Sequence, residues 1–108
     1  MMKARNFYCL QVFSAALLIL TAGCTKKGGD TSSLYTPSSA DVTASATLEE
    51  LQMGRVLYID KCEACHQLYS PDTYSPSQWR SILNSMAPKA GMSASEEQLV
   101  SKYVTRGN

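Results

Sequence analysis

The chain has 108 residues, of which 44% are hydrophobic and 18% charged, and its formal net charge is +1. This length allows at most one small domain, and the near-zero charge gives no electrostatic support for nucleic-acid binding. The composition is not that of a collagen-like, low-complexity or highly charged disordered chain. The four cysteines are the most informative feature, because their number fits two disulfides, a metal site, a redox pair or a covalent attachment site.

The N-terminal segment has the pattern of an export signal. A start with basic and no acidic residues is followed by an almost wholly apolar run over residues 7–20, which is short for a membrane-spanning helix. Small residues then precede Cys24. The sequence Thr21-Ala22-Gly23-Cys24 resembles the bacterial lipobox, although that family prefers leucine where this chain has threonine. The resemblance implies a lipoprotein signal peptide over residues 1–23 and a diacylglycerol on the cysteine.

Lipidation of Cys24 would attach the protein firmly to a bacterial membrane, because acyl chains contribute about 0.8 kcal/mol per buried CH₂. We therefore expect an exported, lipid-anchored protein whose domain lies outside the cytoplasm, in the periplasm or at the cell surface. Two alternatives remain, an ordinary signal peptide and an uncleaved membrane anchor, and in both of them Cys24 has no role.

Residues 24–46 are predicted to be the lipidated cysteine and a flexible linker. Ser, Thr, Gly and Ala dominate this segment, and Leu34, Tyr35 and Val42 are its larger apolar residues. Such a segment buries too little apolar surface to offset the entropy of ordering it. We interpret it as a plain spacer, since nothing in the sequence supports docking of Leu34 and Tyr35.

Residues 47–108 are predicted to form an all-α domain, a bundle of about three helices. Each helix opens with a capping box, in which two residues three positions apart satisfy each other's free backbone N–H groups. The three pairs are Thr47 and Glu50, Ser75 and Gln78, and Ser93 and Glu96. Apolar side chains recur at helical spacing after each pair. Gly54, in the middle of the first helix, indicates a place where another helix crosses closely.

The sequence Cys62-Glu63-Ala64-Cys65-His66 is C-x-x-C-H, the attachment signature of c-type haem. Two thiols at this spacing add to the two vinyl groups of one macrocycle, and the adjacent histidine ligates the iron. The motif therefore predicts one haem c per chain, with Cys62 and Cys65 as covalent attachment residues and His66 as the proximal iron ligand. Cys9 would leave with the signal peptide.

Three other interpretations of the motif are weaker. A zinc site needs four ligands, and the chain after Cys24 has no cysteine or histidine beyond Cys62, Cys65 and His66. A thioredoxin-like dithiol needs a βαβ setting, which the helical pattern does not provide. A local disulfide between the two cysteines would make the chain a purely structural lipoprotein and leave His66 without a role.

Residues 47–108 resemble a class I cytochrome c. The resemblance rests on the C-x-x-C-H motif after an N-terminal helix, on a methionine before the last helix, and on helix-pairing residues. Gly54 and Tyr58 match the family's contact pair on the first helix, and Tyr103 matches the aromatic residue on the last. The segment 74–88 resembles small bacterial monohaem cytochrome c lipoproteins. The resemblance implies a small bundle around one covalently attached haem.

The sixth iron ligand is predicted to be a methionine. His66 is the chain's single histidine, so one chain cannot supply two histidine ligands. The other candidates are Met53, Met86, Met92 and Lys89, or an open position. Met86 lies just ahead of a proline and of the last helix, much as the family's ligand methionine does, and is the first choice. Met92 is the second choice.

The resemblance implies electron transfer and no enzymatic activity, because His and Met ligands leave no free position for a substrate. The expected partners are redox proteins bound to the same membrane. The alternative is a haem-based small-ligand sensor or binder with an open or weakly held sixth position. By the same resemblance, Trp79 packs on the haem or the core, or donates to a propionate, and the loop at Pro71 supplies a carbonyl for the imidazole N–H of His66.

Overall fold

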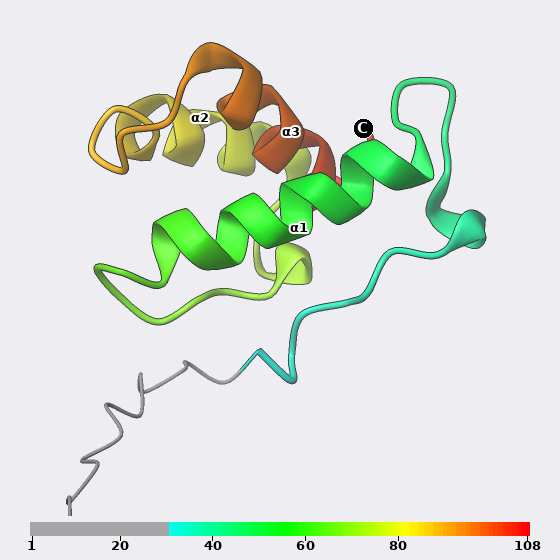
Figure 1. The fold of residues 1–108 in the computed structure, drawn as a ribbon, viewed down its shortest axis with the longest axis horizontal. Coiled ribbons are helices and arrows are strands. Elements are labelled where there is room, and N and C mark those ends of the chain that lie inside the picture. The colour runs from blue at the N-terminus through cyan, green and yellow to red at the C-terminus, as the bar shows by residue number, and fades with distance from the viewer. Residues whose placement is uncertain (1–30) are drawn as a thin grey trace, which may run out of the picture.

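The computed structural model describes residues 31–108, which form an all-α domain without strands (Figure 1). Its elements, in chain order, are η1 (Ser39–Asp41), α1 (Leu48–Cys62), η2 (Pro71–Thr73), α2 (Pro76–Met86) and α3 (Ala94–Val104). The three α-helices are the three that the sequence predicted, and η1 and η2 are single turns of 3₁₀-helix.

All three predicted capping boxes are confirmed. The hydroxyl of Thr47 accepts a hydrogen bond from the N–H of Glu50 at 3.2 Å, and the Glu50 carboxylate accepts one from the N–H of Thr47 at 2.9 Å. The same reciprocal bonds join Ser75 to Gln78 and Ser93 to Glu96. Each helix therefore follows a residue with an extended backbone. The side-chain oxygen of that residue accepts from an N–H in the first turn, and the glutamate or glutamine three positions later accepts from the residue's own N–H.

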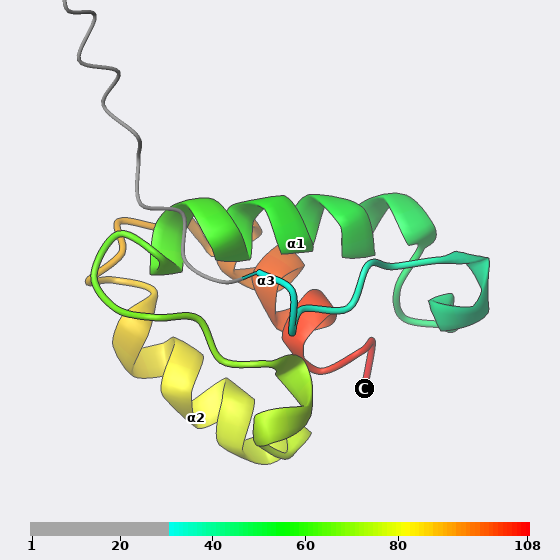
Figure 2. The ribbon, with the colours of Figure 1, turned by 90° about the horizontal axis from the view of Figure 1, so that it is seen from below.

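Helices α1 and α3 cross in close contact (Figures 1 and 2). A Cβ added at Gly54 would overlap the carbonyl oxygen of Leu99 and would lie 2.9 Å from the Cβ of Tyr103. The predicted close crossing at Gly54 is thus confirmed, and only glycine fits there. Lys102 Nζ lies 2.6 Å from Glu50 Oε1, which adds an ion pair between the same two helices.

The core lies between α1, α2 and α3. Trp79 and Leu83 extend into it from α2, and both are 3% exposed. The other buried members of the main cluster are Leu34, Tyr58, Val100, Tyr103 and Val104. The rings of Tyr58 and Tyr103 lie 5.8 Å apart between centroids, so the aromatic contact expected between the first and last helices is present.

Residues 34–46, called the strap below, differ from the expected flexible spacer, because they pack against the helices. Leu34 is 5% exposed, Ala46 is 2% exposed, and the ring of Tyr35 stacks on that of Tyr103. The physical reason is that a few well-placed apolar side chains suffice to fix a segment whose average composition is polar. Residues 1–30 lie outside the described residues.

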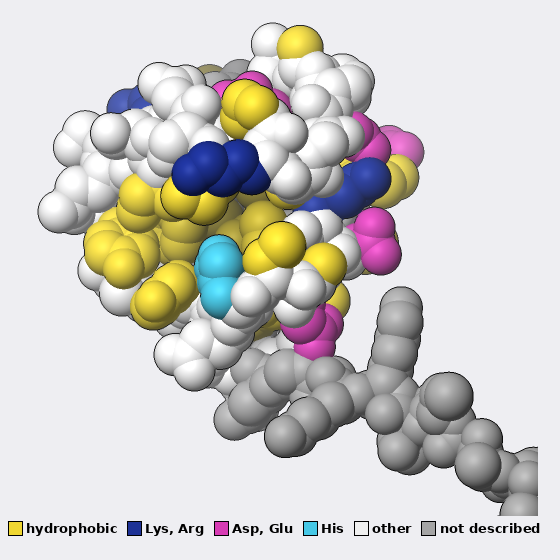
Figure 3. Space-filling view, turned by 90° about the vertical axis from the view of Figure 1, so that its left-hand side faces the viewer, with side chains coloured by type: hydrophobic (Ala, Val, Ile, Leu, Met, Phe, Trp, Pro, Cys, Tyr) yellow, Lys and Arg dark blue, Asp and Glu magenta, His cyan; other side chains and the backbone are white. Residues whose placement is uncertain are grey.

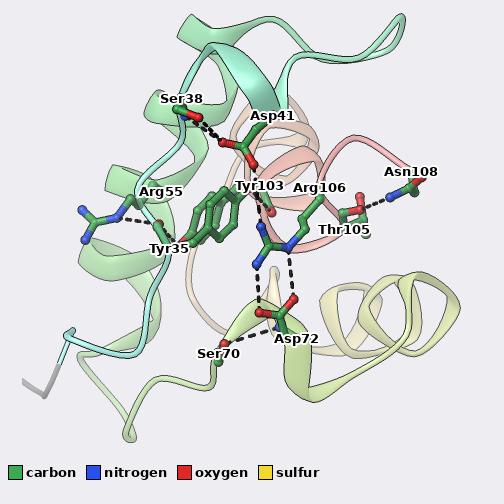
Figure 4. Close-up of polar contacts among 10 residues, drawn as sticks. All are labelled: Tyr35, Ser38, Asp41, Arg55, Ser70, Asp72, Tyr103, Thr105, Arg106 and Asn108. Carbon is green, nitrogen blue, oxygen red and sulfur yellow. Dashed lines mark hydrogen bonds and ion pairs between the residues drawn. The ribbon is translucent and has the colours of Figure 1, made fainter.

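Arg106 fastens the strap to the rest of the domain (Figure 4). Its guanidinium carbon lies 3.9 Å from the centroid of the Tyr35 ring, a cation–π contact. The same group donates two hydrogen bonds to the carboxylate of Asp72, at 2.8 and 3.1 Å, and lies 3.8 Å from Asp41. These partners raise the pKa of Arg106, the hydrogen bond to Asp72 most of all. One side chain thus joins η1, η2 and the C-terminal segment.

Candidate haem-attachment site

The C-x-x-C-H motif begins at the C-terminal end of α1. Cys62 is the last residue of this helix, and its carbonyl accepts a hydrogen bond from the N–H of Cys65 at 3.4 Å. This turn brings the second thiol and the imidazole directly after the helix. Cys62 is half-buried and packs against the core, whereas Cys65 and His66 are exposed.

Both thiols of the motif are free in the structure, and no disulfide joins Cys62 to Cys65. Burial, and to a smaller extent the neighbouring Cys65, raise the pKa of the Cys62 thiol to about 11. Cys62 is therefore a protonated, largely apolar group at neutral pH. A half-buried thiol beside an exposed one is compatible with two thioether bonds along one edge of a macrocycle.

The imidazole of His66 is held in one tautomer. Its Nδ1 lies 2.7 Å from the carbonyl oxygen of Gln67, and because a carbonyl only accepts, Nδ1 carries the proton. The lone pair of the neutral ring then lies on Nε2, which is the nitrogen that ligates a metal in this tautomer. The donor set of two thiols and an oriented imidazole fits a c-type haem.

Two details of the expected site can be compared with the structure. The carbonyl that accepts from His66 belongs to Gln67, which lies in the loop that leads from α1 to Pro71. The Pro71 carbonyl instead accepts a hydrogen bond from the indole Nε1–H of Trp79 at 2.8 Å. Trp79 is buried and its N–H donates inside the protein, which is the contact expected of a core residue; packing on a haem and a contact to a propionate stay predictions.

The loop between the motif and α2 is fastened by side chains from α1, α2 and the C-terminal segment. The hydroxyl of Tyr58 donates to the carbonyl of Tyr69 at 2.8 Å and accepts from the N–H of Tyr69 at 3.1 Å. Trp79 holds Pro71, as described above, and Arg106 binds the carboxylate of Asp72. Burial raises the pKa of Tyr58 to about 12. This loop therefore keeps a defined shape beside His66.

An apolar surface accompanies the motif. On the side of the molecule drawn in Figure 3, hydrophobic side chains gather around a hollow, and a histidine side chain (cyan) lies at its edge. Of the partly buried apolar side chains that pack against the core, Ile59, Cys62 and Leu68 belong to the motif or lie within three residues of it in the sequence. A macrocycle that is mostly apolar requires such a surface next to its attachment residues.

The methionines that are candidates for the sixth ligand differ in burial. Met53 is 48% exposed on α1. Met86 is the last residue of α2 and is half-buried, and Met92 is half-buried and packs against the core. Met86 and Met92 lie at the two ends of the turn between α2 and α3, where the N–H of Met92 donates to the carbonyl of Ala87 at 3.0 Å. Both stay candidates, with Met86 the first choice.

Sequence reasoning did not find the contributions of Gln67, Tyr69 and the strap. The Gln67 contact uses a backbone carbonyl, which every residue has, so no sequence signal marks it. Tyr69 lies three residues after His66, and its ring centroid lies 6.0 Å from that of the imidazole. The sequence signal for Tyr69 was its position as an aromatic residue three positions after His66, and this signal was not used.

Among residues 31–108, no cluster of three or more His, Cys, Asp and Glu side chains is arranged to hold a metal ion. Within the same range, no helix has the length and hydrophobicity needed to cross a membrane. The predicted signal peptide over residues 1–23 and the predicted lipidation of Cys24 fall outside the described residues. No protein-family model, curated protein or solved structure matches this chain.

Proposed function

We propose that this chain is a membrane-anchored monohaem c-type cytochrome that carries electrons through a His/Met-ligated haem. The observation that carries the proposal is the C-x-x-C-H motif at the end of α1, with two free thiols and an imidazole fixed in the metal-ligating tautomer. Cys62 and Cys65 would form the two thioether bonds, and His66 would be the proximal ligand through Nε2.

A bound haem c supplies reversible one-electron chemistry at its iron. The residues of this chain hold and orient the group and limit its contact with water. Gln67 fixes the imidazole plane through its carbonyl, and Tyr58 fixes the loop that follows. The half-buried Cys62 places one thiol against the apolar core. These contacts favour a haem environment that changes little between oxidation states, which suits a carrier.

The proposed distal ligand is the thioether of Met86, with Met92 as the second choice. A soft thioether opposite histidine raises the reduction potential relative to two histidines. If His66 and a methionine both bound the iron, no position would be left for a substrate. This arrangement supports a carrier and not an enzyme.

The proposed anchor is a lipid on Cys24, which would hold the domain close to redox partners in the same membrane and raise its effective concentration there. Contacts between redox proteins are usually small and transient. We therefore expect encounters with membrane-bound donors and acceptors to be brief.

The proposal is tested by the intact mass of the mature protein, made in a bacterial host that attaches haem c. We expect cleavage before Cys24, added acyl chains and one covalent haem. In a denaturing gel stained for haem, the wild type should stain and a Cys62→Ser, Cys65→Ser double variant should not. A mature wild-type protein without covalent haem would overturn the proposal.

A second measurement separates the carrier from a small-ligand binder. The reduced protein is mixed with carbon monoxide, and its optical spectrum is followed. An unchanged low-spin spectrum supports the carrier. Rapid binding of carbon monoxide would mean that the sixth position is open or weakly held, and the chain would then be a haem-based sensor or binder.

A further inference from the structure

The strap lies between the predicted lipid anchor and the first helix, so its contacts decide how much of the chain is left as a tether. From Cys24 to Leu34 the chain has ten residue steps, and from Cys24 to Thr47 it has twenty-three. A fully extended chain spans at most about 3.3–3.6 Å per residue, so these two lengths reach about 35 Å and about 80 Å. A docked strap therefore more than halves the greatest distance between the anchor and the domain.

The strap is bound to the domain at both of its ends. At its first end, Leu34 is buried in the core cluster, and the hydroxyl of Tyr35 donates to the carbonyl of Tyr103 on α3 at 2.9 Å. At its last end, Ala46 is buried, and the N–H of Thr43 donates to the Ala46 carbonyl at 3.0 Å. Because both ends are bound, the residues between them do not lengthen the tether.

Tyr35, at the start of the strap, is held through both its side chain and its backbone (Figure 4). Its carbonyl accepts from the hydroxyl of Tyr103 at 3.1 Å and from Nε of Arg55 at 3.2 Å, and its ring stacks on that of Tyr103. Arg106 adds the cation–π contact to the same ring. Contacts from α1, α3 and the C-terminal segment thus converge on a residue eleven positions after the predicted anchor. In a plain spacer, the first bound residue would instead lie at the first helix.

We propose that the strap limits how far the domain reaches from the membrane, and so restricts its partners to proteins whose docking surface lies close to the same bilayer. This inference rests on the proposed lipid on Cys24. A small helical domain is about 30 Å across, so its far side lies at most about 65 Å from the bilayer with the strap docked, and at most about 110 Å without it. The partners that fit are integral membrane redox proteins whose electron-exchanging group is accessible within the shorter distance.

Two insertions of the same Gly/Ser segment, about 20 residues long, distinguish a docked strap from a plain spacer. One is placed before the strap, between residues 30 and 31. The other is placed inside it, between the exposed residues Ala44 and Ser45, in the turn that the backbone pair of Thr43 and Ala46 closes. The lipidated proteins are attached to a supported bilayer of phosphatidylethanolamine and phosphatidylglycerol, and neutron reflectometry measures the distance from the bilayer to the protein layer. The insertion before the strap should move this layer outward by on the order of 10 Å, and the insertion inside the strap should not move it.

An outward shift for the insertion inside the strap, or none for the insertion before it, would overturn the inference. Hydrogen exchange of the wild type is a second test that needs no insertion. Peptides that cover the strap should exchange slowly, because N–H groups such as that of Thr43 donate to backbone carbonyls, and exchange at the rate of an unfolded chain would also overturn the inference. A wild-type protein that does not attach to the bilayer overturns the proposed anchor together with this inference. Attachment with either contrary shift overturns this inference alone.

Discussion

Tyr35 and Tyr103 exchange a pair of hydrogen bonds. The hydroxyl of Tyr35 donates to the carbonyl of Tyr103 at 2.9 Å, and the hydroxyl of Tyr103 donates to the carbonyl of Tyr35 at 3.1 Å (Figure 4). The two rings stack with centroids 4.8 Å apart and planes inclined by 14°. Arg55 Nε also donates to the Tyr35 carbonyl, at 3.2 Å. Tyr35 is thus the residue through which the strap is bound to both α1 and α3.

The first prediction concerns the contribution of Tyr35 to stability. Tyr35→Phe removes one hydrogen bond and should lower the free energy of unfolding by about 1 kcal/mol. Tyr35→Ala also removes the stacked ring and its cation–π contact, and we expect a loss of about 3 kcal/mol. Urea unfolding of the purified protein measures both. The control is Val42→Ala, because Val42 lies in the strap but is 47% exposed. A Tyr35→Ala variant as stable as wild type would show that the strap does not stabilise the domain.

The second prediction concerns the crossing of α1 and α3. Gly54→Ala should gain about 1 kcal/mol in helix propensity, but overpacking against the Leu99 carbonyl should cost more, typically 1–3 kcal/mol and sometimes above that. We therefore expect a net loss of stability in urea unfolding. The matched control is Gln52→Ala on the exposed side of the same helix, which should change stability by less than about 0.5 kcal/mol. A stabilised Gly54→Ala variant would contradict the close crossing.

The helices were predictable because their signals are local. A capping box such as Thr47 and Glu50 needs only residues three positions apart, and the structure confirms all three boxes. The strap was not predictable because its partners are distant in sequence. Tyr35 and Tyr103 are separated by 68 positions, and nothing in the composition of residues 24–46 indicates that pairing.

The same distinction applies to the candidate site. The C-x-x-C-H motif is defined by its own spacing, and it was found from the sequence. The partner of the His66 imidazole is the carbonyl of Gln67, and a backbone carbonyl has no sequence signature. The Pro71 carbonyl itself accepts from Trp79, and the expected accepting carbonyl comes from Gln67, earlier in the loop that leads to Pro71.

The third prediction concerns acid stability. The hydrogen bond from Lys102, followed by that from the Thr47 N–H, holds the pKa of Glu50 below its usual range. A depressed pKa in the folded state stabilises the protein above the unfolded-state pKa, about 4.3, and this contribution is lost as the pH falls through the folded-state value. Lys102→Gln should therefore be less stable than wild type at neutral pH, and the difference should shrink in acid.

Urea unfolding of both proteins near neutral pH and near pH ~3 tests this prediction, with the acid condition chosen below the usual glutamate pKa. The control is Lys89→Gln, which removes the same charge from an exposed lysine that forms no ion pair among residues 31–108. If Lys102→Gln lowers the free energy of unfolding by the same amount at both pH values, the Glu50–Lys102 pair is not the source of the loss.

The fourth prediction separates the ligand role of a methionine from its packing role. Met86→Ala should remove the methionine-to-iron charge-transfer band of the oxidised protein, because the proposed thioether ligand is then absent. Met92→Ala should keep the band but lower the free energy of unfolding by about 2 kcal/mol, since Met92 packs against the core. Met53→Ala is the control and should change neither measurement, because Met53 is 48% exposed. If Met92→Ala loses the band and Met86→Ala keeps it, the ligand is Met92, and the turn between α2 and α3 supplies the thioether from its other end.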